Sequence, residues 1–255
     1  MSSAPIGQRN ILVFGATSAI AQAVLRLMVA RGASIYCVGR NSDKLEALLA
    51  DLRVRAGPGQ RIAGTTADLL EMDRHPALFA AADGSLGGLD AVLIAHGELP
   101  DQARCETSVQ QAIDAIAVNA TSAVSLLTLA ASYFEPRGRG IIAAISSVAG
   151  DRGRGGNYVY AAGKSLLSTF LQGLRHRLTP RGIRVVTIKP GFVRTPMTAR
   201  FEQSRLLWAD PATVAQGIVR AMEKSNGEVY LPWFWYWIML VLRHVPERLF
   251  LKLRF

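Results

Sequence analysis

Asn10-Ile-Leu-Val-Phe14 is a short apolar run that leads directly into the small-residue turn Gly15-Ala-Thr-Ser-Ala-Ile-Ala21. The run is typical of a strand buried on both faces. The turn opens a helical pattern of apolar residues over 23–28. A turn of this kind between a first strand and a first helix lets backbone N–H groups and the positive helix end approach a pyrophosphate. We therefore expect a dinucleotide site near the start of the chain.

Strand-like and helical stretches alternate along the rest of the chain. The later apolar, β-branched runs are 34–38, 91–94, 141–145, 184–188 and 228–231. The stretches 108–131, 158–178 and 211–224 are long enough for crossover helices. This alternation predicts a parallel sheet with helices on both faces. In a chain of 255 residues without repeats or a linker, we expect one α/β domain over 1–231, a Rossmann-like doubly wound parallel sheet in three αβα layers.

Tyr160 and Lys164 stand four residues apart in the expected helix 158–178, so their side chains share one face. An ammonium beside a phenol stabilises the phenolate. A phenol that ordinarily titrates near pH ~10 can then act as a general acid or base nearer neutrality. Such pairs also occur by chance on solvated helices, so the pair needs support from the rest of the chain.

That support comes from the small-residue turn together with Asn119 and Ser147, and over residues 9–231 the chain resembles the short-chain dehydrogenase/reductase family. The resemblance implies a nicotinamide cofactor and the catalytic tetrad Asn119, Ser147, Tyr160 and Lys164. In this arrangement Ser147 polarises the substrate oxygen, Tyr160 moves the proton, and Lys164 lowers the pKa of the tyrosine and binds the nicotinamide ribose. Asn119 sustains the proton relay by holding a water.

The resemblance also implies a cofactor site built from separated segments. Lys189-Pro-Gly-Phe-Val-Arg-Thr195 matches the family's segment near the nicotinamide carboxamide, and Asp68 matches its acid near the adenine. The residues expected to bind the cofactor are Gly15, Thr17, Ser18, Ala19, Ile20, Arg40, Asp68, Ala95, Gly97, Tyr160, Lys164, Pro190, Gly191, Val193 and Thr195.

Two departures from the family pattern fall at this site. The usual turn Thr-Gly-x-x-x-Gly-x-Gly has Phe14 in place of its threonine and Ala19 and Ala21 in place of its second and third glycines. Alanine permits close approach as long as φ stays negative, so we expect a tighter pocket. Ile94-Ala-His-Gly97 replaces the usual Asn-Asn-Ala-Gly, and we expect its histidine, His96, to be structural rather than catalytic.

The end of the second strand indicates the cofactor. An acid there would bond the ribose hydroxyls of NAD, whereas an arginine accommodates the extra phosphate of NADP. Here Gly39 takes the acid's place and Arg40 follows it. The guanidinium offers a fork of donors to a phosphate. NADP(H) is therefore favoured over NAD(H).

Composition limits the other classes of function. Cys37 and Cys105, the two cysteines, lack metal-ligand spacing, so we expect neither a metal site nor a disulfide scaffold. Residues 1–8 lack the apolar core of a signal peptide, and we expect a cytoplasmic protein. The net charge of +10 calls for an anionic partner. Without a nucleic-acid motif, that partner is expected to be a phosphorylated substrate or an anionic membrane.

Residues 232–255 continue past the last expected strand as an aromatic and basic extension. The apolar run 233–242 is well short of the ~20 residues needed to span a bilayer. Clustered Trp and Tyr followed by Arg and Lys suit an amphipathic helix pair in the lipid headgroup region. The enzyme would then be peripheral on the inner face of the membrane. The alternative is contact with another subunit, in the homodimer or homotetramer that we expect.

The extension also bears on the substrate, because a membrane-bound enzyme gains most from a lipid-anchored one. The turn, the Ala-His-Gly segment and the loop 146–154 resemble the branch containing decaprenylphosphoryl keto-pentose reductases. In that loop, Arg152 and Arg154 are candidates for a substrate phosphate or for solvated charges. Residues 195–208 are expected to form a substrate lid, with either an apolar channel or core packing formed by Met197, Phe201, Leu206, Leu207 and Trp208.

The sequence thus predicts an NADP(H)-dependent short-chain oxidoreductase that interconverts a ketone and a secondary alcohol. A hydrophobic or lipid-linked carbonyl compound, such as a polyprenyl-phosphate keto-sugar, is the first substrate class. Two alternatives stay open, namely a reductase of a small soluble or acyl-carrier-linked ketone and a non-catalytic NADP-binding sensor or scaffold.

Overall fold

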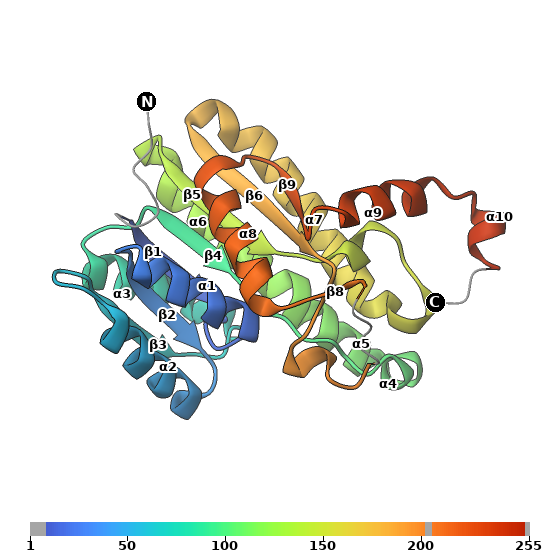
Figure 1. Ribbon diagram of the computed structural model, residues 1–255, viewed down its shortest axis with the longest axis horizontal. Coiled ribbons are helices and arrows are strands. Elements are labelled where there is room, and N and C mark those ends of the chain that lie inside the picture. The colour runs from blue at the N-terminus through green and yellow to red at the C-terminus, as the bar shows by residue number, and fades with distance from the viewer. Residues whose placement is uncertain (1–8, 202–205, 253–255) are drawn as a thin grey trace.

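A computed structural model describes residues 9–201 and 206–252, and Figure 1 shows its central sheet with helices on both sides. Seven parallel strands form this sheet in the order β3-β2-β1-β4-β5-β6-β9. Their bounds are β1 Asn10–Phe14, β2 Ser34–Gly39, β3 Ile62–Thr66, β4 Ala91–Ile94, β5 Gly140–Ile145, β6 Ile183–Pro190 and β9 Glu228–Leu231. The order reverses between β1 and β4, and a doubly wound sheet opens a ligand crevice at such a point.

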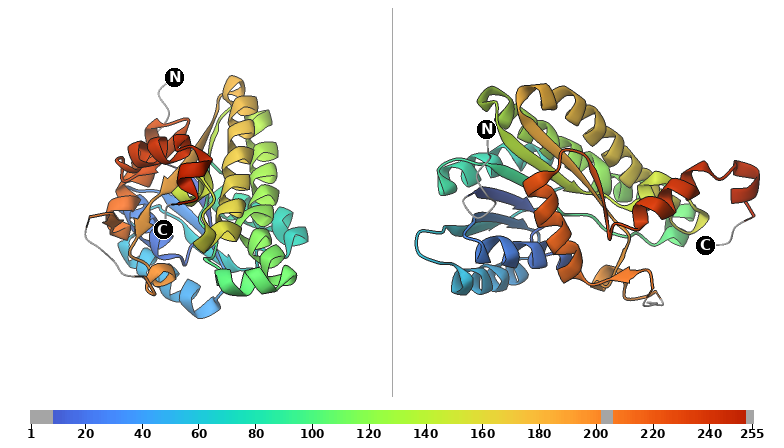
Figure 2. Two further views of the ribbon diagram at one scale, coloured as in Figure 1. Left: turned by 90° about the vertical axis from the view of Figure 1, so that its right-hand side faces the viewer. Right: turned by 45° about the horizontal axis from the view of Figure 1, so that its top comes forward.

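The strands are apolar because helices cover both faces of the sheet. Against one face pack α1 (Ala19–Ala30), α2 (Ser42–Arg55) and α8 (Pro211–Lys224). Against the other pack α3 (His75–Leu86), α6 (Ser122–Phe134) and α7 (Tyr158–Leu178). The three layers are visible in both views of Figure 2. The predicted Rossmann-like three-layer fold is confirmed.

The helix expected over 108–131 is interrupted near its middle. α5 (Val109–Ile116) runs into a π-helical turn, η3 (Ala117–Thr121), before α6 begins. The whole stretch Val109–Arg137 is long and apolar enough to cross a membrane by length and composition. Its α6 part packs against the sheet through Leu126, Leu127 and Phe134, which accounts for the apolar sequence.

The smaller elements are α4 (Gln102–Thr107), the two-stranded ribbon of β7 (Phe192–Val193) and β8 (Trp208–Ala209), and short 3-10 turns. The last strand leads into the expected extension, where α9 (Trp235–His244) and α10 (Glu247–Phe250) lie at one end of the molecule (Figure 1). Trp235 and Met239 of α9 are buried against Val148 and Tyr230, which ties the extension to the body.

Candidate active site

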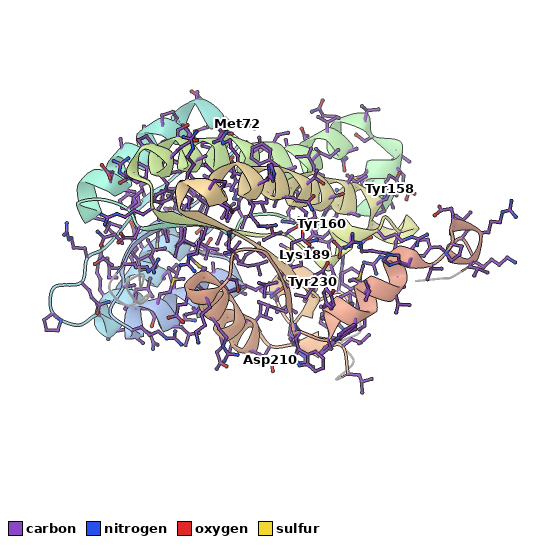
Figure 3. The ribbon with its side chains drawn as sticks, turned by 90° about the horizontal axis from the view of Figure 1, so that it is seen from above. Met72, Tyr158, Tyr160, Lys189, Asp210 and Tyr230 are labelled. Atoms are coloured by element: carbon purple, nitrogen blue, oxygen red, sulfur yellow. The ribbon has the colours of Figure 1, made fainter. Side chains whose placement is uncertain are left out.

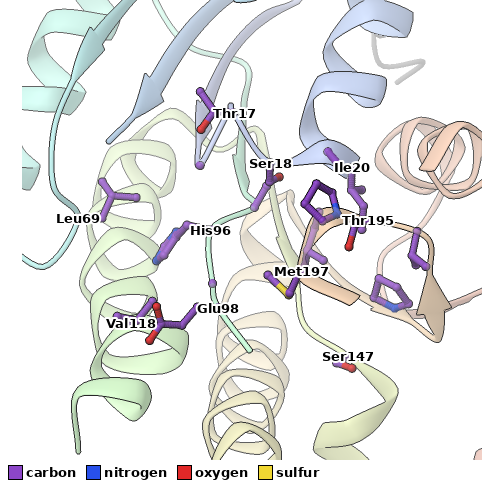
Figure 4. A pocket seen from close by; sticks show the side chains of 18 of the residues that line it. Thr17, Ser18, Ile20, Leu69, His96, Glu98, Val118, Ser147, Thr195 and Met197 are labelled. Carbon is purple, nitrogen blue, oxygen red and sulfur yellow. The ribbon is translucent and has the colours of Figure 1, made fainter. Parts of the chain in front are cut away.

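A cavity of about 480 Å³ lies at the carboxyl ends of the strands, beside the point where the strand order reverses (Figure 4). All fifteen residues expected to bind the cofactor line it. Ser147, Tyr160 and Lys164 of the expected tetrad line it too. Asn119 is buried and does not line it.

The turn after β1 is shaped by a close approach to the turn after β4. Gly15 has a φ of +74°, and a Cβ there would lie 2.5 Å from the backbone nitrogen of His96, so only glycine fits. Ser18 then caps α1 by accepting from Ala21 N at 3.3 Å. No described residue other than glycine has a positive φ. Ala19 and Ala21 therefore have negative φ, which is what allows alanine to replace the family's glycines here. The N–H groups of the first helical turn have no intrahelical acceptor and suit an anionic group.

Small residues bring α7 close to its neighbours. A Cβ on Gly150 would lie 2.7 Å from the carbonyl carbon of Lys164, and one on Gly163 would lie 3.0 Å from Cβ of Asn119. Glycine at both positions therefore lets the loop after Ser147 and the π-helical turn pack directly on the helix that carries Tyr160. Gly163, which lies within Tyr160-Ala-Ala-Gly-Lys164, permits the contact with the π-helical turn.

Lys164 is buried at the floor of the cavity, where its Nζ donates to the Ile145 carbonyl at 3.1 Å. A Cβ on Gly97 would lie 3.1 Å from this Nζ, so the glycine after β4 leaves room for the ammonium. Burial lowers the pKa of Lys164 to about 8. The ammonium is therefore largely charged at neutral pH but loses its proton under mildly alkaline conditions.

Tyr160 differs from the sequence expectation. The prediction was that Lys164 would lower the pKa of the phenol, but burial raises it to about 12, while a hydrogen bond with Ser147 pulls it down. Nζ of Lys164 lies 5.7 Å from the ring centroid of Tyr160. Desolvation disfavours the phenolate more than the neighbouring groups favour it in this structure. Tyr160 is consequently a protonated donor at neutral pH.

Ser147 and Asn119 are held by local hydrogen bonds. Oγ of Ser147 accepts from Ala149 N at 3.1 Å, which leaves its hydroxyl proton for another acceptor. Oδ1 of Asn119 accepts from Glu98 N at 3.1 Å, and its Nδ2 donates to the Ala115 carbonyl at 2.9 Å. Asn119 sits within the π-helical turn, a feature frequent at functional sites.

His96 lines the cavity, and its Nε2 lies 2.8 Å from Oγ of Ser122. Nδ1 is buried without a hydrogen-bond partner among the described residues. Burial lowers the pKa of His96 to about 3, and the charges of Lys164 and His75 act in the same direction. A neutral ring that stays unprotonated near pH 7 fits the expected structural role.

At the opposite end of the cavity, exposed Arg40 is joined by Lys44 and Asn41. Sequence reasoning missed Lys44, although a lysine one turn beyond an arginine at a helix start is a recognisable signal. Asp68 also lines this part, with Oδ1 accepting from Leu70 N at 3.0 Å. The cationic side chains of Arg40 and Lys44 suit a phosphate on the ribose better than the two unmodified ribose hydroxyls.

The segment after β6 also lines the cavity. Here Thr195 and Thr198 form a capping box around a short 3-10 turn, and both line the cavity. A Cβ on Gly191 would lie 1.9 Å from Nε1 of Trp235, so the extension packs directly onto this segment. No local sequence pattern indicates this contact, because it depends on where α9 folds back.

Behind this segment, buried Lys189 joins three elements. Its Nζ lies 2.7 Å from Oδ1 of Asp151 and 2.7 Å from Oε2 of Glu228. The hydroxyl of Tyr230 donates to Oδ2 of Asp151 at 2.7 Å, and burial together with this carboxylate raises the pKa of the phenol. Figure 3 shows Lys189 and Tyr230 side by side in the interior, below Tyr160.

Arg152 does not take the role considered for it as a phosphate ligand. Its Nη1 donates to the carbonyls of Leu242 and Val245 at 2.7 and 2.6 Å, and its Nη2 pairs with Glu247 at 2.9 Å. The guanidinium is thus occupied in holding the extension. Arg154, the second candidate, is partly buried and does not line the cavity.

The described residues of the expected lid, 195–208, lie partly in the cavity lining and partly on the surface. Met197 lines the cavity, whereas Phe201 and Leu206 are exposed. Leu207 and Trp208 pack with the extension, and Trp208 stacks on Phe192 at 5.2 Å between ring centroids. Residues 202–205 of the predicted lid lie outside the described residues.

The residues present fit a nicotinamide dinucleotide. The Gly15 cradle and the start of α1 suit a pyrophosphate, Arg40 and Lys44 suit a ribose phosphate, and Lys164 ends at the floor. In the described ranges 9–201 and 206–252, no cluster of three or more His, Cys, Asp or Glu side chains has an arrangement that would hold a metal ion.

Comparison with known proteins agrees with this architecture. The short chain dehydrogenase family matches residues 9–206, and the chain therefore belongs to the short-chain dehydrogenase/reductase family. An uncharacterized oxidoreductase of Streptomyces coelicolor is 32% identical over 250 residues, which cover 96% of each chain. The protein is thus an oxidoreductase of this family.

Two solved structures share the fold at low sequence identity. The actinorhodin polyketide ketoreductase, crystallised with NADPH, superposes with a TM-score of 0.79 at 23% identity over 91% of this chain and 99% of the other. A putative dehydrogenase from Burkholderia cenocepacia with bound NADP superposes with a TM-score of 0.78 at 18% identity, and the match covers 89% of this chain and 92% of the other.

Proposed function

We propose that the protein is an NADP(H)-dependent carbonyl reductase that interconverts a ketone and a secondary alcohol. The observation that carries the proposal is the convergence of Ser147, Tyr160 and Lys164 at one end of a cavity whose other end holds Arg40 and Lys44. NADPH, when bound, supplies hydride to the carbonyl carbon. The two solved relatives that hold NADPH or NADP support this cofactor.

The chain's own residues handle the proton and the developing charge. Ser147 donates its hydroxyl proton in a hydrogen bond to the ketone oxygen, since its Oγ already accepts from Ala149 N. The raised pKa of Tyr160 keeps the phenol protonated, so it is ready to deliver a proton to the alkoxide as it forms. The Lys164 ammonium then stabilises the phenolate that remains. Asn119 positions this floor by fixing Glu98 and the π-helical turn.

The substrate in this proposal is a hydrophobic or lipid-linked ketone. Val118 and Met197 give the cavity apolar walls on the side of the tetrad. The exposed apolar extension packs on Gly191 of the cavity rim, which would bring a membrane-held substrate close to the site. The enzyme in this proposal works in the cytoplasm.

Two matched tyrosines test the assignment. Tyr160→Phe should lower NADPH oxidation with hydrophobic ketones by about 100-fold or more while NADPH binding, followed by fluorescence, is retained. Tyr158→Phe alters an exposed tyrosine on the same helix (Figure 3) and should leave turnover unchanged. Undiminished turnover in Tyr160→Phe would remove Tyr160 as the proton donor. Binding of NADPH without oxidation by the unaltered protein, across the ketone panel, would favour a sensor.

A further inference from the structure

α9 carries apolar side chains on both of its faces. The inner face, with Trp235, Ile238, Met239 and Leu242, packs on the body of the protein. A surface helix normally presents polar residues on the opposite side. Here that side is apolar as well: Tyr236, Trp237, Leu240 and Val241 are exposed at helical spacing, and exposed Trp233 comes just before the helix.

The exposed apolar surface is concentrated in the extension. Seven of the sixteen exposed large hydrophobic residues in the described part of the chain fall within 233–251, with α10 and the residue after it adding Leu249 and Leu251. Trp233 is 72% exposed and Val241 is 65% exposed. α9 and α10 stand out at one end of the molecule in Figure 1 and in the right view of Figure 2. A contiguous apolar surface of this kind marks an interaction site.

The charges around this surface identify its partner. Arg243, Arg248 and Lys252 are exposed, and none of them forms an ion pair with a described residue. Glu247, the acid within 232–252, is neutralised by Arg152. Self-association about a two-fold axis would bring the same basic residues of two copies together. An anionic surface instead meets both the cations and the aromatic side chains favourably.

Arg152 fixes the orientation in which this surface is presented. It comes from the loop between Ser147 and Tyr160 and holds the end of α9 through the Leu242 and Val245 carbonyls. Its guanidinium also lies 3.8 Å above the ring of Phe250 in α10. The extension follows β9 at the carboxyl edge of the sheet, which is the edge that holds the cavity.

We propose that the outer face of residues 233–252 binds the surface of an anionic lipid bilayer. The ten residues of α9 span roughly 15 Å, about half of the ~30 Å hydrocarbon core, so the helix lies in the headgroup layer and does not cross it. Trp and Tyr rings enter the interface while Arg243, Arg248 and Lys252 meet the lipid phosphates. This proposal is independent of the reaction catalysed.

Vesicle co-sedimentation of the full chain tests the proposal. The protein should sediment with phosphatidylcholine vesicles that contain phosphatidylglycerol, and less with phosphatidylcholine alone or at high salt. Val241→Glu should lower the partition coefficient about tenfold or more, which follows from placing a charge in the interface. Val54→Glu makes the same change at an 89% exposed valine on α2 and should bind as the unaltered protein does. Circular dichroism checks that both variants fold.

Three results would overturn the proposal. The unaltered protein would stay in the supernatant with anionic vesicles, or Val241→Glu and Val54→Glu would sediment equally. The third is dissociation of an oligomer by Val241→Glu, seen by light scattering, without any vesicle binding by the unaltered protein. That result would assign the surface to a second copy of the chain.

Discussion

Nζ of Lys189 lies 2.7 Å from Oδ1 of Asp151, and both side chains are almost fully buried. This ion pair joins the strand before the Pro190-Gly191 turn to the loop after Ser147. Two sides of the cavity are therefore held by one buried pair, which Tyr230 and Glu228 complete.

Removing the lysine should be costly for stability. Lys189→Met leaves Asp151 charged and buried without its cation, and such losses typically cost about 3–5 kcal/mol. Urea unfolding measures the change. Arg104→Met is the control, because it breaks an exposed Arg104–Asp101 pair at 3.7 Å, whose loss should cost less than about 1 kcal/mol. Equal costs would show that the buried pair does not stabilise the fold.

Arg40 should set the preference between the two cofactors. Arg40→Ala removes a charged donor to the ribose phosphate, which is worth about 1.5–3 kcal/mol, so NADPH affinity should fall about 10- to 150-fold. NADH affinity, measured by the same fluorescence titration, should change little. Arg53 lies in α2, the helix that begins just after Arg40, and it does not line the cavity, so Arg53→Ala should alter neither affinity. A parallel loss of NADPH and NADH binding in Arg40→Ala would contradict the assignment.

Half-buried His96 should make stability sensitive to acid. The pKa of His96 falls from 6.5 to about 3 on folding, so the unfolded chain binds the proton more tightly. The stabilisation is present above pH 6.5 and is lost as the pH falls from 6.5 towards 3, by up to ~1.4 kcal/mol per pH unit.

His96→Ala should therefore flatten that dependence. Urea unfolding midpoints at pH 7 and pH 5 measure the pH dependence of stability in the variant and in the unaltered protein. Because His75 is present in both, its contribution cancels when the two are compared. Alanine is also the residue that the family pattern has at this position. Identical pH dependence in the two proteins would mean that His96 does not titrate in this window.

Lys164 predicts the alkaline limit of activity. Its pKa of about 8 means that the ammonium is present below pH 8 and is lost as the pH rises through that value. Since the charge stabilises the phenolate of Tyr160, kcat/KM for ketone reduction should decline above about pH 8. The pH profile of kcat/KM reports the free enzyme. A profile that stays flat to pH 10 would exclude this role for the lysine.

Much of the fold followed from local patterns. The bounds of α7 and α8 agree with the predicted ranges, because apolar periodicity is strong in both and Pro211 suits the first turn of α8. The π-helical turn around Asn119 was not predicted. Gly163 of another helix approaches Asn119 closely at this turn, a contact that no local pattern reports.

The site shows the same division. Motif positions brought Ser147, Tyr160, Lys164 and the cofactor residues to one cavity, whereas Asn119 is buried and does not line it. The expectation of a lowered pKa for Tyr160 was wrong, because that pKa depends on how far the fold desolvates the phenol. Neither alternative considered for Arg152, a phosphate ligand or a solvated charge, describes it, because its partners are backbone carbonyls about ninety residues further along the chain. Lys44 was missed although its spacing from Arg40 was readable.

Hydride transfer is the step that most directly defines the proposed activity. NADPH deuterated at the transferable position is supplied with a membrane extract from the host, and mass spectrometry follows the label, with Tyr160→Phe as the control. We expect deuterium in a lipid-extractable alcohol with the unaltered protein and none with the variant. Label confined to the aqueous fraction would contradict the lipid-linked substrate, and equal labelling by Tyr160→Phe would contradict the central role of that tyrosine.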